Sequence, residues 1–138
     1  MTIVAIDYGK RRLGIATADT STLVALPHGV IERRSMKQDL AVLRGRLEQL
    51  QATLLIVGLP LNMDGTVGRA ALEARKFADI VQNATGLEVQ LIDERLSSFE
   101  AGERLKAAWH RPRRGVRDDA VAAAVILEAW LETHRIAC

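Results

Sequence analysis

Hydrophobic residues along this chain form short unbroken runs in some places and helical stripes in others. Residues 3–6 and 13–18 are apolar runs on either side of a short turn, which predicts a β-hairpin. Residues 23–31 predict a third strand. Pro27 and Gly29 lie within it, and both residue types favour an edge position or a bend. The first third of the chain is therefore predicted to form three strands.

Two segments carry apolar residues at three- and four-residue spacing, which is typical of helices with one buried face. The first begins after Ser35, which forms a capping box with Gln38. Its stripe consists of Met36, Leu40, Leu43, Leu47 and Leu50. The second ends near Gly86, a residue type favoured at helix ends. Its stripe consists of Val67, Ala71, Ala74, Ala78 and Val81.

The remaining elements predict an α/β fold with one mixed sheet. Residues 54–58 are apolar on both faces, which indicates an interior strand of the parallel type, and residues 89–92 predict another strand. A capping box at Ser97 predicts a helix to about residue 108, and a last helix is expected from about Asp118. The predicted apolar face of that last helix is Ala122, Val125, Ile126, Ala129 and Trp130.

Length and composition fit one globular domain spanning residues 1–138. The chain has 138 residues, 49% of them hydrophobic, which is enough to enclose a single core. Its one cysteine, Cys138, excludes an intramolecular disulfide and favours a reducing compartment. No signal-peptide pattern or apolar run of membrane-spanning length occurs in the sequence. We therefore expect a cytoplasmic protein with no membrane partner.

Positive charge is modest overall but locally concentrated. The net charge of +2 favours no particular anionic partner. The segment 110–117 is rich in arginine, and Lys10 and Arg11 follow the first strand. Such basic segments are either solvated loops or contacts for the nucleic-acid backbone. The arginines of the segment 110–117 are Arg111, Arg113, Arg114 and Arg117.

Asp7 is the first candidate for chemistry because it directly ends an apolar strand. A carboxylate at such a position is partly desolvated and needs a cationic partner. With Gly9 and Gly14 it forms a D-x-G-x-x-x-x-G pattern, in which glycine allows a sharp turn and close approach of another group. The alternative is an aspartate that caps the turn and pairs with Lys10 or Arg11.

Two further acidic sites lie at the ends of predicted elements. Asp93, Glu94 and Arg95 follow the last strand, and Asp118 and Asp119 begin the last helix. An aspartate at a helix start often only caps the helix, which explains Asp118. Asp119 precedes a long apolar run and is therefore expected to lie against the sheet.

Carboxylates without accompanying histidine or cysteine ligands select hard cations, here Mg²⁺ or Mn²⁺. Two such ions can activate water and stabilise the leaving oxygen during phosphodiester hydrolysis. The sequence thus favours a metal-dependent nuclease that binds a polyanion through its basic segments.

The chain resembles the YqgF family, also called RuvX, of ribonuclease H-like nucleases and Holliday junction resolvases. Four stretches that span nearly the whole chain carry the resemblance: residues 6–9 with Gly14, residues 56–65, residues 93–98, and Asp119 in its helix. The resemblance implies a ribonuclease H-like fold with a five-stranded mixed sheet flanked by helices. It also implies a divalent-metal nuclease that processes the 5′ end of the 16S ribosomal RNA precursor, or alternatively resolves Holliday junctions.

Carried over by position, the resemblance assigns the catalytic and metal-binding roles to Asp7, Glu94 and Asp119. In ribonuclease H-like enzymes the second acid often lies on the strand beside the first, yet residues 54–58 contain no carboxylate. Asp64, in the loop that follows that strand, is therefore the alternative to Glu94. Asn62 of the same loop and Arg95 are candidates for phosphate contacts.

Two rival functions remain open at this point. The D-x-G-x-x-x-x-G turn also occurs in actin-like ATPases and sugar kinases, but those enzymes close two domains around ATP and this chain has room for one. A domain that binds nucleic acid without cleaving it fits the mild basicity equally well. The substrate is expected to be a structured RNA precursor or branched DNA. Junction resolution needs two sites, which a symmetric homodimer would supply, although no dimer signature is visible.

Overall fold

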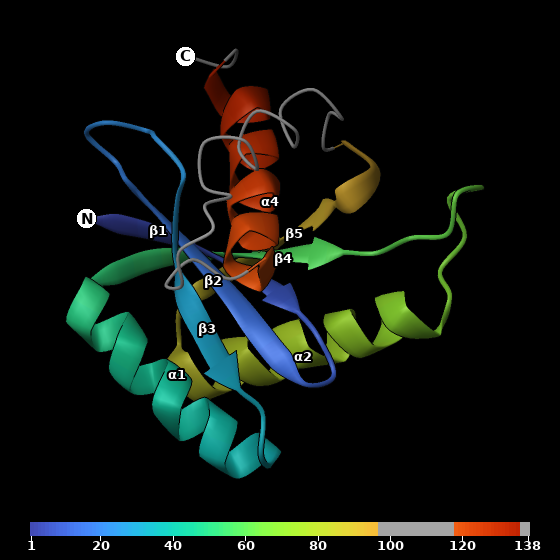
Figure 1. Ribbon diagram of the computed structural model, residues 1–138, viewed down its shortest axis with the longest axis horizontal. Coiled ribbons are helices and arrows are strands. Elements are labelled where there is room, and N and C mark those ends of the chain that lie inside the picture. The colour runs from blue at the N-terminus through green and yellow to red at the C-terminus, as the bar shows by residue number, and fades with distance from the viewer. Residues whose placement is uncertain (97–117, 136–138) are drawn as a thin grey trace.

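A five-stranded mixed sheet forms the centre of the molecule, in the order β3-β2-β1-β4-β5 (Figure 1). The computed structural model describes residues 1–96 and 118–135. Strands β1, β2 and β3 pair antiparallel, while β4 and β5 run parallel to β1. Their bounds are β1 Thr2–Tyr8, β2 Arg12–Asp19, β3 Leu26–Glu32, β4 Ala52–Leu59 and β5 Glu88–Asp93.

The predicted hairpin and the predicted edge strand are both confirmed. In the β1–β2 pair, Asp7 lies opposite Gly14. Strand β3 is at the edge of the sheet, and its register with β2 shifts where Pro27 and Gly29 face β2. Proline has no N–H to donate to a neighbouring strand, so an edge strand tolerates it.

Helices cover both faces of the sheet. Helices α1 (Met36–Leu50) and α2 (Arg69–Thr85) pack on one face, and α4 (Asp118–Arg135) packs on the other (Figure 1). The sheet has a hydrophobic core on each face, and alternate residues of β1 belong to one core or the other. Val4 and Ile6 lie in the core beneath α1 and α2, whereas Ile3 and Ala5 lie in the core beneath α4. Asp7 continues this second set, because strand side chains alternate between faces.

Local signals account for the ends of the helices. The Ser35 hydroxyl accepts a hydrogen bond from the Gln38 amide at 3.2 Å, so α1 begins where the capping box predicts. Helix α2 ends at Thr85 and is capped by Gly86, whose φ of 75° is readily adopted by glycine. Strand β4 lies between β1 and β5, which confirms the interior parallel strand.

Parts of two predicted apolar faces are wrong. Val67 is 42% exposed because α2 begins only at Arg69, and Phe77 is a buried member of that face that the prediction omitted. On α4, Ala122 and Val125 are only half-buried. Residues 120–127 are all apolar, so the pattern could not select the side that faces the sheet. The buried side of α4 includes Ala123, Ala124, Leu127 and Leu131.

Some predictions fall on the segment 97–117, which lies outside the described residues. These are the helix after Ser97 and the arginine-rich segment with Arg111, Arg113, Arg114 and Arg117. Within residues 1–96 and 118–135, no helix has the length and apolar character needed to cross a membrane.

Candidate active site

Asp7 lies near the end of β1, on the face of the sheet that α4 covers, and both neighbouring strands carry glycine beside it. Gly14 of β2 is its antiparallel partner. On the other side, Gly58 of β4 follows Val57, the parallel partner of Ile6. Because neither glycine has a side chain, other groups can approach the Asp7 carboxylate across the sheet.

Gly14 allows the start of α4 to approach the sheet closely. A Cβ atom at Gly14 would collide with the backbone carbonyl of Asp119. The first turn of α4 is therefore placed directly over the strand position that pairs with Asp7. This contact confirms the prediction that Asp119 lies against the sheet.

Gly58 makes room for Glu94. A Cβ atom at Gly58 would lie 3.0 Å from Cγ and 3.1 Å from Cδ of Glu94, and 2.7 Å from Cδ1 of Ile126. Glu94 lies in the 3-10 turn η1 (Glu94–Leu96) that follows β5, yet its side chain extends over β4. The absence of a carboxylate on β4 is thereby explained: β4 leaves space, and the acid comes from the turn that follows β5.

The three carboxylates interact electrostatically. Burial, and then the charges of Glu94 and Asp119, raise the pKa of Asp7 from 3.8 to about 7. Burial, followed by the charge of Asp93, also raises the pKa of Glu94. Asp7 therefore experiences the negative charge of both neighbours. Those neighbours are acids, which argues against a turn-capping aspartate neutralised by Lys10 or Arg11.

Asp119 has a cationic partner that sequence reasoning missed. Its Oδ2 accepts a hydrogen bond from Nε of Arg12 at 2.7 Å, and both side chains are a little over one-third exposed. Within the described part of the chain, no three acidic, histidine or cysteine side chains are gathered closely enough to hold a metal ion. Asp7 and Glu94 offer the oxygen ligands that a hard cation prefers, whereas Asp119 is bonded to Arg12.

The alternative acid, Asp64, is engaged within its own loop. Its Oδ1 accepts hydrogen bonds from the amide and the hydroxyl of Thr66, at 3.0 and 2.6 Å. These bonds lower the pKa of Asp64, which is exposed. The charges that raise the pKa of Asp7 are those of Glu94 and Asp119, and Asp64 is not among them. The geometry therefore favours Glu94 over Asp64.

Asn62 and Arg95, both candidates for phosphate contacts, are bonded within the protein. Asn62 donates from Nδ2 to the Thr66 hydroxyl at 2.9 Å. Arg95 donates from Nε and Nη2 to the Asp93 carboxylate, and from Nη1 to the carbonyl of Met63 at 3.3 Å. Arg95 thus ties the loop after β4 to the end of β5, where Glu94 begins. Its main visible role is to fix that corner of the site.

A buried ion pair supports the turn after Asp7 and was also missed. Asp39 is 3% exposed and binds Nε of Arg33 at 3.2 Å. The same guanidinium donates from Nη1 to the carbonyl of Gly9 at 3.0 Å and lies 4.7 Å from the centre of the Tyr8 ring. The loop between β1 and β2 is therefore held from the α1 side of the sheet. Asp39 could have been noticed as a polar residue at a helical spacing from buried Leu43.

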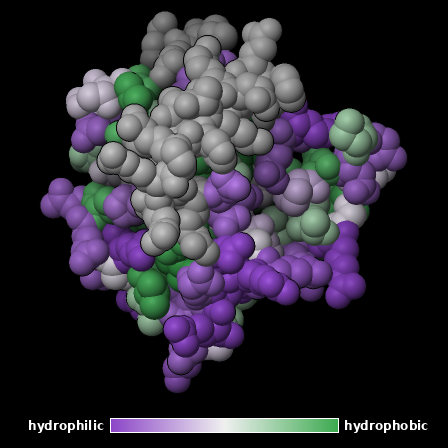
Figure 2. All heavy atoms as spheres, viewed as in Figure 1, coloured by the Kyte–Doolittle hydropathy of each residue, from purple (hydrophilic) through white to green (hydrophobic). Residues whose placement is uncertain are grey.

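The basic residues Lys10 and Arg11 lie in the turn between β1 and β2 and are exposed. This position places two positive charges within a few residues of Asp7. In the view of Figure 2 the described surface is mostly hydrophilic, with only small separate hydrophobic areas. Large exposed hydrophobic side chains are correspondingly scattered, the most exposed being Met63 at 92%.

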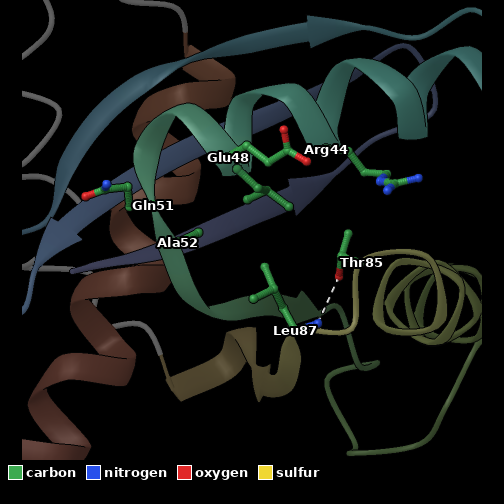
Figure 3. A pocket seen from close by; sticks show the side chains of 7 residues that line it. Arg44, Glu48, Gln51, Ala52, Thr85 and Leu87 are labelled. Carbon is green, nitrogen blue, oxygen red and sulfur yellow. Dashed lines mark hydrogen bonds between the residues drawn. The ribbon is translucent and has the colours of Figure 1, made fainter.

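A pocket elsewhere in the molecule is separate from the carboxylates. It opens between the ends of α1 and α2, where Ala52 begins β4 and Leu87 precedes β5 (Figure 3). Asp7 and Glu94 lie at the opposite ends of the parallel strands. The Thr85 hydroxyl in this pocket accepts a hydrogen bond from the Leu87 amide at 3.2 Å. The lining residues are Arg44, Leu47, Glu48, Gln51, Ala52, Thr85 and Leu87.

Comparison with known proteins identifies the family. Residues 1–133 match the model of the RuvX family, described as Holliday junction resolvase. A protein of Anaeromyxobacter sp. is 45% identical over 134 residues, which are 96% of this chain and 97% of that protein. A protein of Picosynechococcus sp. is 39% identical over 136 residues, which are 97% of this chain and 94% of that protein. Both carry the name "Putative pre-16S rRNA nuclease".

Solved structures establish the fold. RuvC of T. thermophilus in complex with a Holliday junction substrate has a TM-score of 0.65 at 14% identity, covering 99% of this chain and 96% of that one. The fowlpox virus resolvase bound to Holliday junction DNA has a TM-score of 0.60 at 10% identity, covering 97% of this chain and 99% of that one. The predicted ribonuclease H-like fold, with a five-stranded mixed sheet and helices on both faces, is confirmed.

Proposed function

The chain belongs to the RuvX family of nucleases, and we propose that it hydrolyses phosphodiester bonds with Asp7, Glu94 and Asp119 as its catalytic acids. Membership of this family implies dependence on a divalent metal in general. We propose Mg²⁺ or Mn²⁺, because the candidate ligands are carboxylate oxygens.

One observation carries the proposal: Asp7 is flanked by glycines, and the charges of two other carboxylates, Glu94 and Asp119, act on it. Like charges in a partly buried site are unfavourable unless a cation or a proton compensates them. Burial of Asp7, and then the charges of Glu94 and Asp119, raise its pKa to about 7. A domain that bound nucleic acid without cleaving it would gain no affinity from negative charge at this position.

Each residue has a distinct part in the proposed reaction. Asp7 and Glu94 would hold the metal, and Asp119 would join them from the start of α4. A divalent metal in such a site lowers the pKa of bound water and stabilises the charge of the leaving oxygen. Lys10 and Arg11, exposed beside the site, would contact the nucleic-acid backbone, as would Arg111, Arg113, Arg114 and Arg117.

The proposed substrate is the precursor of 16S ribosomal RNA. The support is the name of relatives that are 39% to 45% identical over nearly the whole chain. A four-way DNA junction is the second candidate, favoured by the description of the family and by the likeness of the fold to RuvC. Phosphate contacts alone do not separate the two, because RNA and DNA share them.

Cleavage of matched substrates distinguishes these possibilities. Labelled fragments of the ribosomal RNA precursor and a four-way DNA junction are incubated with the protein and Mn²⁺, with and without chelator. We expect metal-dependent cleavage of the RNA near the 5′ end of the mature sequence. Preferential cleavage of the junction would instead identify branched DNA as the substrate. Binding of both substrates with cleavage of neither would contradict the nuclease function.

A further inference from the structure

Arg12 lies beside the proposed active site and has no role in the proposed reaction. It begins β2, two residues before Gly14, and therefore projects from the same face of the sheet as Gly14. That face carries Asp7 and is covered by α4. The 2.7 Å bond from Nε of Arg12 to Asp119 links the edge of the site to the start of that helix.

The backbone of Asp119 packs tightly against β2, whereas its side chain is 36% exposed. Its carbonyl packs on Gly14 so closely that a Cβ atom there would collide with it. Gly14 is also the strand partner of Asp7. The Asp119 carboxylate can therefore change partner only if its side chain rotates. Such a rotation would take it from Arg12 to a partner nearer Asp7.

We propose that Arg12 is a positioning residue that competes with the metal ion for Asp119. In the metal-free protein its guanidinium holds the Asp119 carboxylate, and binding of the metal requires this ion pair to open. The inference rests on the proposed function, because it takes Asp119 as a metal ligand. It adds a residue that sets metal affinity without binding the metal.

A second carboxylate is placed to receive Arg12 when the pair opens. Glu32 of β3 lies directly opposite Arg12 in the β2–β3 pair. Its charge already acts on the guanidinium, together with that of Asp119. Arg12 could therefore leave Asp119 for the carboxylate opposite it, which would exchange one partly exposed ion pair for another. Such pairs are individually weak, so the competition is modest in size.

Calorimetric titration of the metal-free protein with Mn²⁺, without nucleic acid, tests the proposal. The variant is Arg12→Gln, and the matched control is Arg11→Gln, which removes the same charge from an exposed neighbour. We expect Arg12→Gln to bind Mn²⁺ about twofold to fivefold more tightly than Arg11→Gln, the range that a surface ion pair supports. Arg12→Lys, which retains the charge, is expected to bind Mn²⁺ close to the wild-type affinity.

A double-mutant comparison decides between competition and a general charge effect. In the Asp119→Asn background, Arg12→Gln is expected to change Mn²⁺ affinity no more than Arg11→Gln does. Equal affinities of Arg12→Gln and Arg11→Gln in the wild-type background would overturn the proposal. So would weaker binding by an Arg12→Gln protein that unfolds in urea like the wild type. Failure of the proposed function gives a different result: Mn²⁺ binding that Asp7→Asn leaves unchanged.

Discussion

Replacement of Asp7 by asparagine is expected to stabilise the metal-free protein above neutral pH. The amide keeps the shape of the side chain but carries no charge beside Glu94 and Asp119. In the folded protein the pKa of Asp7 is raised from 3.8 to about 7. Because the raised group is an acid, its ionisation destabilises the folded state. This destabilisation is absent below 3.8, the pKa of Asp7 in the unfolded chain. It grows as the pH rises from 3.8 to about 7, and it is complete above about pH 7.

The size of this effect follows from the pKa difference. At about 1.4 kcal/mol per pH unit, the upper limit is about 4 kcal/mol at pH 8.5 and roughly 1.7 kcal/mol at pH 5. Rotation of the neighbouring carboxylates and water at the partly open site reduce both values, so we expect about 1–3 kcal/mol at pH 8.5. The gain in unfolding free energy for Asp7→Asn should thus be larger at pH 8.5 than at pH 5.

Urea unfolding with chelator at the two pH values measures the effect. Asp64→Asn is the matched control, because Asp64 is exposed and its hydrogen bonds to Thr66 lower its pKa. Asp64→Asn should not raise the unfolding free energy at either pH. An Asp7→Asn protein that is equal to or less stable than the wild type at pH 8.5 would refute the electrostatic reasoning. Added Mn²⁺ should stabilise the wild type more than Asp7→Asn, since only the wild type retains the full charge.

Two further substitutions test how the site is supported. Gly58→Ala should reduce cleavage at least tenfold and lower stability by about 1–3 kcal/mol, because its Cβ would displace Glu94. The control is Gly45→Ala, because a Cβ atom at Gly45 would meet open space within helix α1. Urea unfolding should show that this variant gains about 0.5–1 kcal/mol of unfolding free energy. Asp39→Asn should cost about 2–4 kcal/mol, since it leaves the guanidinium of Arg33 partly buried without its counter-charge. Unchanged cleavage by Gly58→Ala, or an Asp39→Asn protein as stable as the wild type, would contradict these assignments.

Patterns of local sequence predicted the described elements well. The capping box at Ser35, the run over residues 54–58 and the proline in β3 each identified an element and its place. These signals are local, because backbone capping, side-chain alternation and the missing proline N–H act within a few residues. The orientation of α4 was less predictable, because an all-apolar run contains no polar residue to mark the solvent side.

The sequence proposes the acids of the candidate site but not the residues that surround them. Asp7 and Glu94 were identified by their positions at strand ends and by the family resemblance. The roles of Gly58 and Arg12 depend on strands that are neighbours only after folding, so no local pattern could reveal them. Strand β4 carries no acid near Asp7 because it has Gly58 there, and this glycine leaves room for the side chain of Glu94.

Cleavage by two variants tests the central assignment most directly. Wild type, Glu94→Gln and Asp64→Asn are compared on the ribosomal RNA precursor fragment with Mn²⁺, after urea unfolding has shown that all three are folded. We predict that Glu94→Gln loses at least a hundredfold in cleavage rate, whereas Asp64→Asn stays within a few-fold of wild type. Loss of cleavage in Asp64→Asn with retention in Glu94→Gln would contradict the account, because Asp64 would then be the second acid beside Asp7.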